Sequence, residues 1–260
     1  VYMPEWGFNG IGDWDFFQGY QYKMLESSIL TVRGSRVIPQ LNTITLASGW
    51  NMMSYLRKES ADVAVTLAEI EESISILKDE DGQVYIPEFD FNGIGNFNQG
   101  KGYQLKTLNE TSFTFASNND GLRLEQNNHA AIAKNTKRFA RPVNTGSNHT
   151  VLILETAWDE DIREGDELAA YDKDGNMVGS VALQQGHNSI AVWGDDEYTE
   201  EKEGMQTAEL FSLVLYKESS DEMITLKVAE FERGSNTFIK DGMTVIAGFE
   251  QEAVITQEME

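Results

Sequence analysis

The residue types with the clearest chemistry in this sequence are closely spaced carboxylates in its second half. The stretch YDKDGN places oxygen-bearing side chains at alternate positions, Asp172, Asp174 and Asn176. Calcium binds roughly six to eight such oxygens, but an EF-hand loop also needs a glutamate further along, which is missing here. Two interpretations stay open, a calcium site and a β-hairpin with Asp174-Gly175 as its turn. The hairpin is favoured.

A second acidic stretch, VWGDDEYTEEKEG, crowds six carboxylates into nine residues. Like charges this close raise carboxylate pKa values unless a cation or the solvent relieves them. Asp195 and Asp196 are the candidate ligands, and a solvated acidic loop is an alternative of nearly equal weight. Ca²⁺ is the cofactor that the two stretches would bind if they bind a metal.

Patterns typical of catalysis are sparse. The three histidines, His129, His149 and His187, stand in unrelated contexts, and there is no cysteine. The sequence has no GxSxG elbow, HExxH helix or Walker loop. A carboxylate pair of the glycosidase kind is not excluded by counting, yet nothing singles one out. We therefore expect a protein that is not an enzyme.

A repeated motif organises the first half of the chain. VYMPEWGFNGIGDWDFFQGYQYKM, residues 1–24, aligns without a gap with VYIPEFDFNGIGNFNQGKGYQLKT, residues 84–107, at an offset of 83 residues. Identical residues include Tyr2/Tyr85, Pro4/Pro87, Asn9/Asn92, Gly10/Gly93, Gly12/Gly95, Gly19/Gly102 and Tyr20/Tyr103. Such a match indicates duplication of a structural unit. We expect both segments to share one backbone, with the common glycines in matching conformations.

The first copy is rich in aromatic side chains. Its candidate interface residues are Trp6, Trp14, Phe16 and Phe17, which correspond to Phe89, Phe97, Gln99 and Gly100 in the second copy. Positions that are aromatic in both copies are expected in the core. Phe16 and Phe17, aromatic only in the first, are the better candidates for a contact surface. That surface would contact a sugar or, as we favour, another protein module.

The second copy defines the whole unit. NTITLASGWNMMSYL alternates as a strand does and turns at Gly-Trp. A helix capped by Ser60 or Asp62 is predicted next, with the apolar stripe Val63, Leu67, Ile70 and Ile74. ISILKDEDGQVYIP predicts a hairpin that turns at Asp81-Gly82. FNGIGNFNQGKG leads into a strand rather than a helix, so a connection between strands is favoured over a phosphate loop.

The second half predicts an antiparallel β-sandwich, because short β-rich runs from TVLILE to MTVIAGF alternate with turn residues. The expected fold is mainly β with minor α, consisting of small α+β repeat modules followed by the sandwich. The expected division is a C-terminal half of a first module (1–40), a complete second module (41–110), an irregular connection (111–148) and the sandwich (149–260).

The charge balance limits the partners. With 20 Lys+Arg against 43 Asp+Glu, the net charge is -23, and nucleic acids and anionic membranes both attract the opposite sign. Apolar runs of the length that spans a membrane are absent. We therefore expect neither nucleic-acid binding nor membrane insertion. A salty extracellular medium, which screens self-repulsion, suits such a chain.

Two sets of motifs resemble modules of secreted proteins. LASGWNMMSY, ILKDEDGQVYIP and GKGYQLK resemble the GWN-type repeats of multidomain surface proteins of Bacteroidetes. IREGDELAAYDKDGNMVGS and the IAVWGDDEYTEEKEG stretch resemble a second module often found beside them. The resemblance implies export by type IX secretion and a location at the cell surface or beyond it. It supplies no activity and no site residues.

These observations predict a secreted structural or adhesive protein, a modular segment of a cell-surface fibre or filament. The expected partners are other protein modules or copies of itself. The alternative is a calcium-dependent module that binds surface carbohydrate. The first copy lacks the strand, the helix and the first hairpin arm of the unit, so residues 1–40 alone would expose a sheet edge and apolar residues. We expect a longer polypeptide, or else another subunit, to complete it, with Val1–Pro4 as an interior strand.

Overall fold

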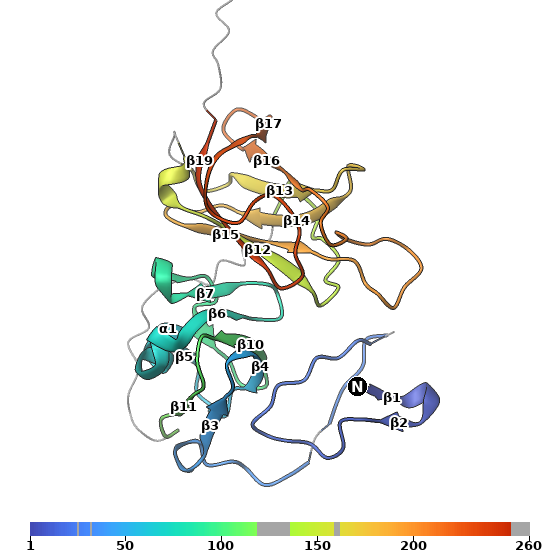
Figure 1. Cartoon of the computed structure of the whole chain (residues 1–260), viewed down its shortest axis with the longest axis vertical. Helices are drawn as coiled ribbons and strands as arrows, with labels where there is room; N and C mark the ends of the chain where they lie inside the picture. Colours follow the sequence, from blue (N-terminus) through green and yellow to red (C-terminus); the bar gives the residue numbers. More distant parts are fainter. Residues whose placement is uncertain (25, 32, 119–135, 159–161, 251–260) are drawn as a thin grey trace, which may run out of the picture. The chain divides into compact units, whose positions relative to one another are not determined.

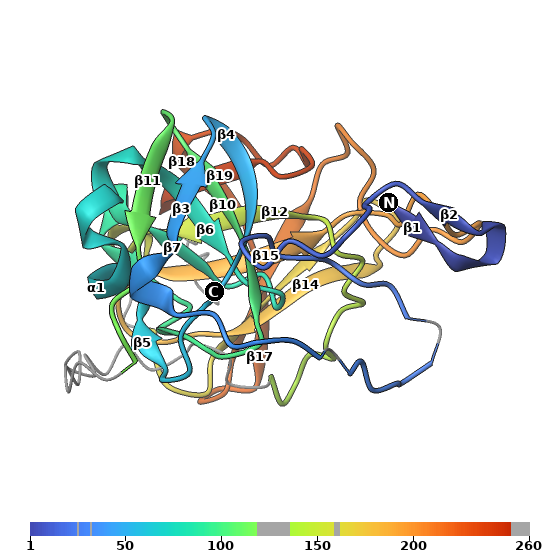
Figure 2. The ribbon, with the colours of Figure 1, turned by 90° about the horizontal axis from the view of Figure 1, so that it is seen from below.

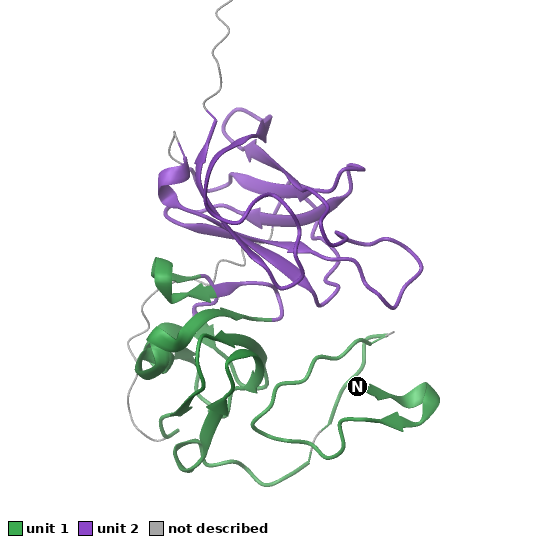
Figure 3. Ribbon diagram, viewed as in Figure 1, with its two compact units in different colours: residues 1–79, 85–92, 96–128 green, residues 80–84, 93–95, 129–260 purple. Residues whose placement is uncertain are grey.

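The computed structural model describes residues 1–24, 26–31, 33–118, 136–158 and 162–250. The chain divides into two compact units, coloured separately in Figure 3. Unit 1 consists of residues 1–79, 85–92 and 96–128, and unit 2 of residues 80–84, 93–95 and 129–260. Among the residues that the structure describes, 39% lie in strands and one helix has 11 residues, so the predicted fold class is confirmed.

The repeat module is organised around a five-stranded sheet with the order β4-β10-β6-β7-β8. Its strands are β4 (Gly49–Ser54), β10 (Gly102–Thr107), β6 (Ile74–Lys78), β7 (Val84–Ile86) and β8 (Phe91–Asn92). Strands β6 and β7 form the predicted hairpin, and Gly82 at its tip has a φ of 79°. Only glycine adopts that conformation without steric cost, which explains its place in the turn.

The predicted helix is present and shorter than its apolar stripe. Helix α1 (Val63–Leu67) continues as the 3₁₀ helix η3 (Ala68–Ser73), and Ile74 already belongs to β6. Asp62 is the cap, because its carboxylate accepts the backbone N–H of Val65 at 3.0 Å. The helix buries Val63, Leu67 and Ile70 as the pattern predicted.

Two short sheets complete the module. Strand β3 (Thr43–Leu46) pairs with β11 (Thr111–Thr114), and the two run side by side in Figures 1 and 2. Strand β5 (Ala61–Asp62) pairs with β9 (Asn96–Phe97). Phe115, which follows β11, is buried against the ring of Tyr55. Residues 111–115 therefore pair and pack with residues of the second module.

The first copy forms a small hairpin of its own. Strand β1 (Tyr2–Met3) pairs with β2 (Phe8–Asn9) across the 3₁₀ helix η1 (Pro4–Trp6). In both views this hairpin projects away from the five-stranded sheet of unit 1 (Figures 1 and 2). Residues 17–19 instead follow the outer edge of β4, where the Gly19 N–H donates to the Met52 carbonyl at 3.1 Å. Gly19 is needed there, because a Cβ would lie 2.7 Å from the Met53 carbonyl oxygen.

Unit 2 contains the predicted sandwich, with two four-stranded sheets. One sheet has the order β15-β12-β19-β18, and the other has the order β14-β13-β16-β17. Their bounds are β12 (Asn148–Ile153), β13 (Glu167–Tyr171), β14 (Met177–Ala182), β15 (Asn188–Trp193), β16 (Ser212–Lys217), β17 (Glu222–Leu226), β18 (Val228–Arg233) and β19 (Met243–Phe249). Every pair is antiparallel except β12 with β19, which is parallel.

One predicted strand of the sandwich divides in two. MITLKVAE supplies β17 to one sheet and β18 to the other, with Lys227 between them. Both are edge strands, and the β18–β19 register is irregular at three places. Bends and bulges of this kind let a chain pass from one sheet of a sandwich to the other. A continuous apolar alternation does not reveal such a corner.

Residues 136–148, which lead into the sandwich, are held by contacts within unit 2. The buried Glu167 side chain accepts the backbone N–H groups of Arg138 and Phe139, both at 3.0 Å. His129 and the basic residue Lys134 lie outside the described residues. Among the described residues, no helix is long and apolar enough to cross a membrane.

Candidate functional site

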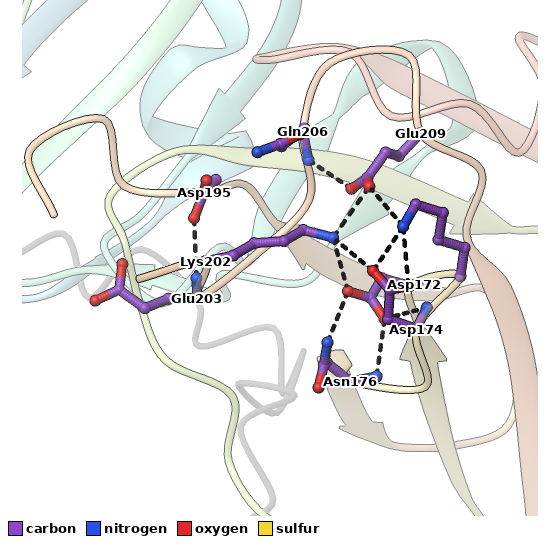
Figure 4. A network of polar contacts seen from close by, with 9 residues as sticks. Asp172, Asp174, Asn176, Asp195, Lys202, Glu203, Gln206 and Glu209 are labelled. Carbon is purple, nitrogen blue, oxygen red and sulfur yellow. Dashed lines mark hydrogen bonds and ion pairs between the residues drawn. The ribbon is translucent and has the colours of Figure 1, made fainter. Parts of the chain in front are cut away.

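The Asp172 carboxylate forms the centre of a polar network in unit 2 (Figure 4). One of its oxygens accepts the backbone N–H groups of Asp174 at 2.9 Å and Asn176 at 2.8 Å. The Gly175 N–H donates to the Asp172 carbonyl at 3.2 Å, and Gly175 has a φ of 84°. This is the hairpin turn between β13 and β14 that the sequence predicted, and the turn is confirmed.

Lys202 occupies the other side of Asp172. Its ammonium group donates to the second Asp172 oxygen at 2.9 Å and to Glu209 at 3.0 Å, and lies 3.5 Å from Asp174 (Figure 4). The Asn176 side-chain amide donates to the same Asp172 oxygen at 3.0 Å. Lys173 supplies a second positive charge, because its ammonium group donates to the two Asp174 carboxylate oxygens at 2.9 and 2.7 Å. The positive charges that balance these carboxylates are therefore lysines of the chain itself.

The pKa values follow from this arrangement. Burial acts to raise the pKa of Asp172, but hydrogen bonds from Asn176 and Lys202 outweigh it and lower the pKa to about 2. Burial likewise acts to lower the pKa of Lys202, while hydrogen bonds to Asp172 and Glu209 raise it above its ordinary value. Both charges are thus fixed at neutral pH, as in a structural ion pair.

The acidic loop around Asp195 uses its carboxylates to shape its own backbone. Asp195 accepts the N–H of Glu203 at 2.9 Å, and Asp196 accepts the N–H of Tyr198 at 2.9 Å. Across the described part of the chain, no group of three or more His, Asp or Glu side chains is placed to hold a metal ion. The calcium site at Asp172, Asp174 and Asn176 or at Asp195 and Asp196 stays a prediction.

The two described histidines lie apart and bond to the backbone. His149 is buried, and its ring nitrogens contact the Ile239 carbonyl at 3.0 Å and the Thr244 hydroxyl at 2.9 Å. His187 accepts the N–H of Glu155 at 3.0 Å. The Thr244 hydroxyl donates its own proton to the Ser235 carbonyl at 2.6 Å, so it accepts from His149 rather than donating to it. These contacts hold both imidazole rings in place.

The two copies of the repeat have the same local structure. Tyr2 pairs with Asn9 and Met3 with Phe8, as Tyr85 pairs with Asn92 and Ile86 with Phe91. The hairpins close alike, through the Gly10 N–H on the Val1 carbonyl at 2.9 Å and the Gly93 N–H on the Val84 carbonyl at 2.8 Å. A tyrosine hydroxyl then accepts a backbone N–H in both, Tyr20 from Asp15 at 2.8 Å and Tyr103 from Asn98 at 3.0 Å. The predicted common backbone is confirmed for the hairpin and for the turn that the tyrosine closes. It does not extend over the rest of the repeat, because Gly102–Thr107 is strand β10 and residues 19–24 form no strand.

The surroundings of the two copies are opposite. Val84, Phe91 and Phe97 are 0%, 6% and 0% exposed, while their counterparts Val1, Phe8 and Trp14 are 65%, 53% and 56% exposed. Tyr2 and Ile11 are exposed in the same way. We call Val1, Tyr2, Phe8, Ile11 and Trp14 the open face of the first copy. The counterparts of these side chains are buried in the core of the second module, whereas here they are exposed to solvent.

The four predicted interface residues have different positions. Trp6 and Trp14 are exposed, although their counterparts are aromatic, so aromaticity in both copies did not mean burial in both. Phe16 is exposed and Phe17 half-buried, and their rings lie 4.2 Å apart. The Phe17 carbonyl accepts the N–H of Ser54 at 3.3 Å, which places this segment on the β4 edge.

Lys173, Lys202 and Glu209 are the site residues that the sequence reasoning missed. A signal for Lys202 was present, because it is the only basic residue in the run from Asp195 to Glu203. A lone cation among so many carboxylates is well placed to bind several of them. Its partner Glu209 follows it by 7 residues in the same connection between β15 and β16, whereas Asp172 lies 30 residues before Lys202 and only the fold brings these two together.

The chain was compared with family models, curated proteins and solved structures. No family model, no curated protein and no solved structure matches the chain.

Proposed function

We propose that this chain is a non-enzymatic structural or adhesive protein of the cell surface, a modular segment of a fibre or adhesin. The observation that carries the proposal is the open face of the first copy. A repeated hairpin is presented once with its apolar side chains buried and once with them exposed. Exposed apolar patches of this kind are typical of surfaces that bind other proteins.

Three further features support the proposal. The described histidines contact backbone groups and the Thr244 hydroxyl, whose proton is already donated to the Ser235 carbonyl, and the charges of Asp172 and Lys202 neutralise each other in place. Repetition of one unit along a chain is the usual construction of proteins that extend and assemble. The net charge of -23 favours a medium with enough salt to screen it.

The location can be tested in the cells that make the protein. An antibody raised against unit 2 is applied to intact cells and to permeabilised cells, followed by gold labelling and electron microscopy. We expect gold on the surface of intact cells and on material that extends from them. Labelling only after permeabilisation would overturn the proposal.

A carbohydrate-binding module is the second candidate, and Tyr198 is the observation that favours it. Its side chain is 75% exposed within the acidic loop that contains Asp195 and Asp196. An exposed aromatic ring beside carboxylates suits sugar stacking together with calcium. Glycan-array binding in the presence of calcium, lost in a chelator and in Tyr198→Ala, would replace the structural proposal with this one.

A further inference from the structure

The second copy shows what covers the residues that the first copy leaves open. Strand β7 lies between β6 and β8 in the sheet, and Phe97 pairs with Ala61 and stacks on Tyr55 at 5.2 Å. The cover consists mainly of one segment, which includes Tyr55, β5, α1, η3 and β6. We call residues 55–78 the cover segment.

Polar contacts fix the register of this cover. The Tyr85 hydroxyl donates to the Glu71 carboxylate at 3.0 Å, and the Asn92 amide donates to the Asp62 carboxylate at 3.3 Å. Both donors are conserved between the copies, as Tyr2 and Asn9. The first copy therefore keeps the apolar side chains and also the two hydrogen-bond donors that a cover segment recognises.

We infer that the open face of the first copy binds a strand–helix–strand segment with the sequence pattern of residues 55–78, supplied by a further repeat module. The pattern consists of an apolar stripe like Val63, Leu67 and Ile70, with carboxylates at the places of Asp62 and Glu71. The backbone needed to receive it is already formed, because the first hairpin has the register and closing bond of the second.

A second copy of this chain has no cover segment to spare. Its own residues 55–78 already cover its own residues 84–107, and an exchange would expose one apolar face for each one it buries. Such an exchange gains no buried apolar area, and burial is the main driving force for association. The occupant must bring a cover segment that lacks a partner of its own.

The inference deepens the proposed function, since it names what the exposed face binds. The test uses the full chain with a second copy of residues 41–83 fused directly before Val1. Hydrogen exchange of the Gly10 amide is measured by mass spectrometry or NMR in the fused and the unmodified chain. We expect exchange in the fusion to slow by on the order of tenfold or more, toward that of Gly93.

The matched control carries Val63→Asp and Leu67→Asp in the added copy alone. It has the same length and the same hairpin connection without the apolar stripe, so Gly10 should exchange as in the unmodified chain. Unchanged exchange in the fusion, with amides of unit 2 as protected as before, would overturn the inference. Equal protection in the control would overturn it as well, because the stripe would then be irrelevant.

One further result would assign the face differently. Protection of Gly10 in the unmodified chain that rises with concentration, together with a dimer in sedimentation velocity, would make a second copy the occupant. The cell-surface labelling does not depend on any of these results. If the fusion does not protect Gly10 but the antibody labels intact cells, the inference about the occupant is wrong and the proposed location stands. If the fusion protects Gly10 but labelling requires permeabilisation, the proposed location is wrong and the inference about the occupant stands.

Discussion

Residues 1–24 and residues 84–107 close the same hairpin in the same register, yet only the second copy is buried. Their shared geometry comes from residues that act locally. A proline begins the 3₁₀ turn in each, at Pro4 and Pro87, and a residue with positive φ ends it, Gly7 at 60° and Asp90 at 49°. Turn chemistry of this kind needs no partner from elsewhere in the chain.

Burial, by contrast, comes from distant residues. In the second copy Phe97 lies on Tyr55, Tyr85 bonds to Glu71 and Asn92 bonds to Asp62, all at separations of at least 14 residues. The first copy has the same side chains or close equivalents and no such partners in the described residues. The comparison teaches that the local sequence sets the hairpin, whereas the cover segment makes it part of a stable core.

The largest expected difference between the copies is at their matched aromatic position. Phe97→Ala should lower the free energy of unfolding of unit 1 by about 3–5 kcal/mol, because it leaves a cavity beside Tyr55. Trp14→Ala should cost about 1 kcal/mol or less, since Trp14 is exposed and mainly contacts Tyr20. Hydrogen exchange of the β10 amides measures unit 1 alone. Equal losses in the two variants would contradict the comparison.

Alkaline pH should weaken the second copy through a buried tyrosine. Burial raises the pKa of Tyr103 to about 12, above its ordinary value of 10.0. The folded state then holds the phenolic proton more tightly than the unfolded state, so its contribution is complete below pH 10 and is lost as the pH rises toward 12. Tyr103→Phe should flatten the decrease in unit 1 stability over this range. An unchanged slope would place the titrating group elsewhere.

A smaller difference is expected at the matched tyrosines of the hairpin. Tyr85→Phe removes the hydroxyl that bonds to Glu71 and should cost about 1 kcal/mol. Tyr2→Phe removes a hydroxyl on an exposed side chain and should leave stability unchanged within error. In the chain with the added cover segment, Tyr2→Phe should become costly too. A cost for Tyr2→Phe in the unmodified chain would show that the open face is already covered.

Elements with local signals were predictable from the sequence. The Asp62 cap and the turns at Gly82 and Gly175 lie where the residue types required them. The duplicated hairpin was predicted from identity alone. The corner at Lys227, where the chain passes from one sheet of the sandwich to the other, was not predicted. The sequence of β17 and β18 alternates as a single strand would, and both are edge strands.

The candidate sites were predictable only in part. Asp172 was identified as a residue that binds a cation, but the cation beside it is Lys202, which follows it by 30 residues. Trp14 was named as a candidate interface residue and also fell under the expectation that positions aromatic in both copies lie in the core, and its exposure could not be read from its own copy. In both cases the environment of the residue depends on a segment that is distant in the sequence. The spacing of neighbouring residues does not predict that segment.

The smallest expected effect lies at the position that ends the two turns, where one copy has glycine and the other aspartate. Gly7 and Asp90 both end the 3₁₀ turn with positive φ, and a Cβ at Gly7 would meet no neighbour. Asp90→Gly should stabilise the second copy by less than about 1 kcal/mol, because relief of the left-handed strain exceeds the entropy that glycine adds to the unfolded chain. Gly7→Asp should loosen the first hairpin by a similar amount and leave the β10 amides unchanged, since that hairpin is not part of the unit 1 core. The Gly93 and Gly10 amides, which close the two hairpins, measure each effect separately. If Gly7→Asp weakened β10 as well, the first hairpin would already be coupled to the core, and the open face would be less independent than its exposure indicates.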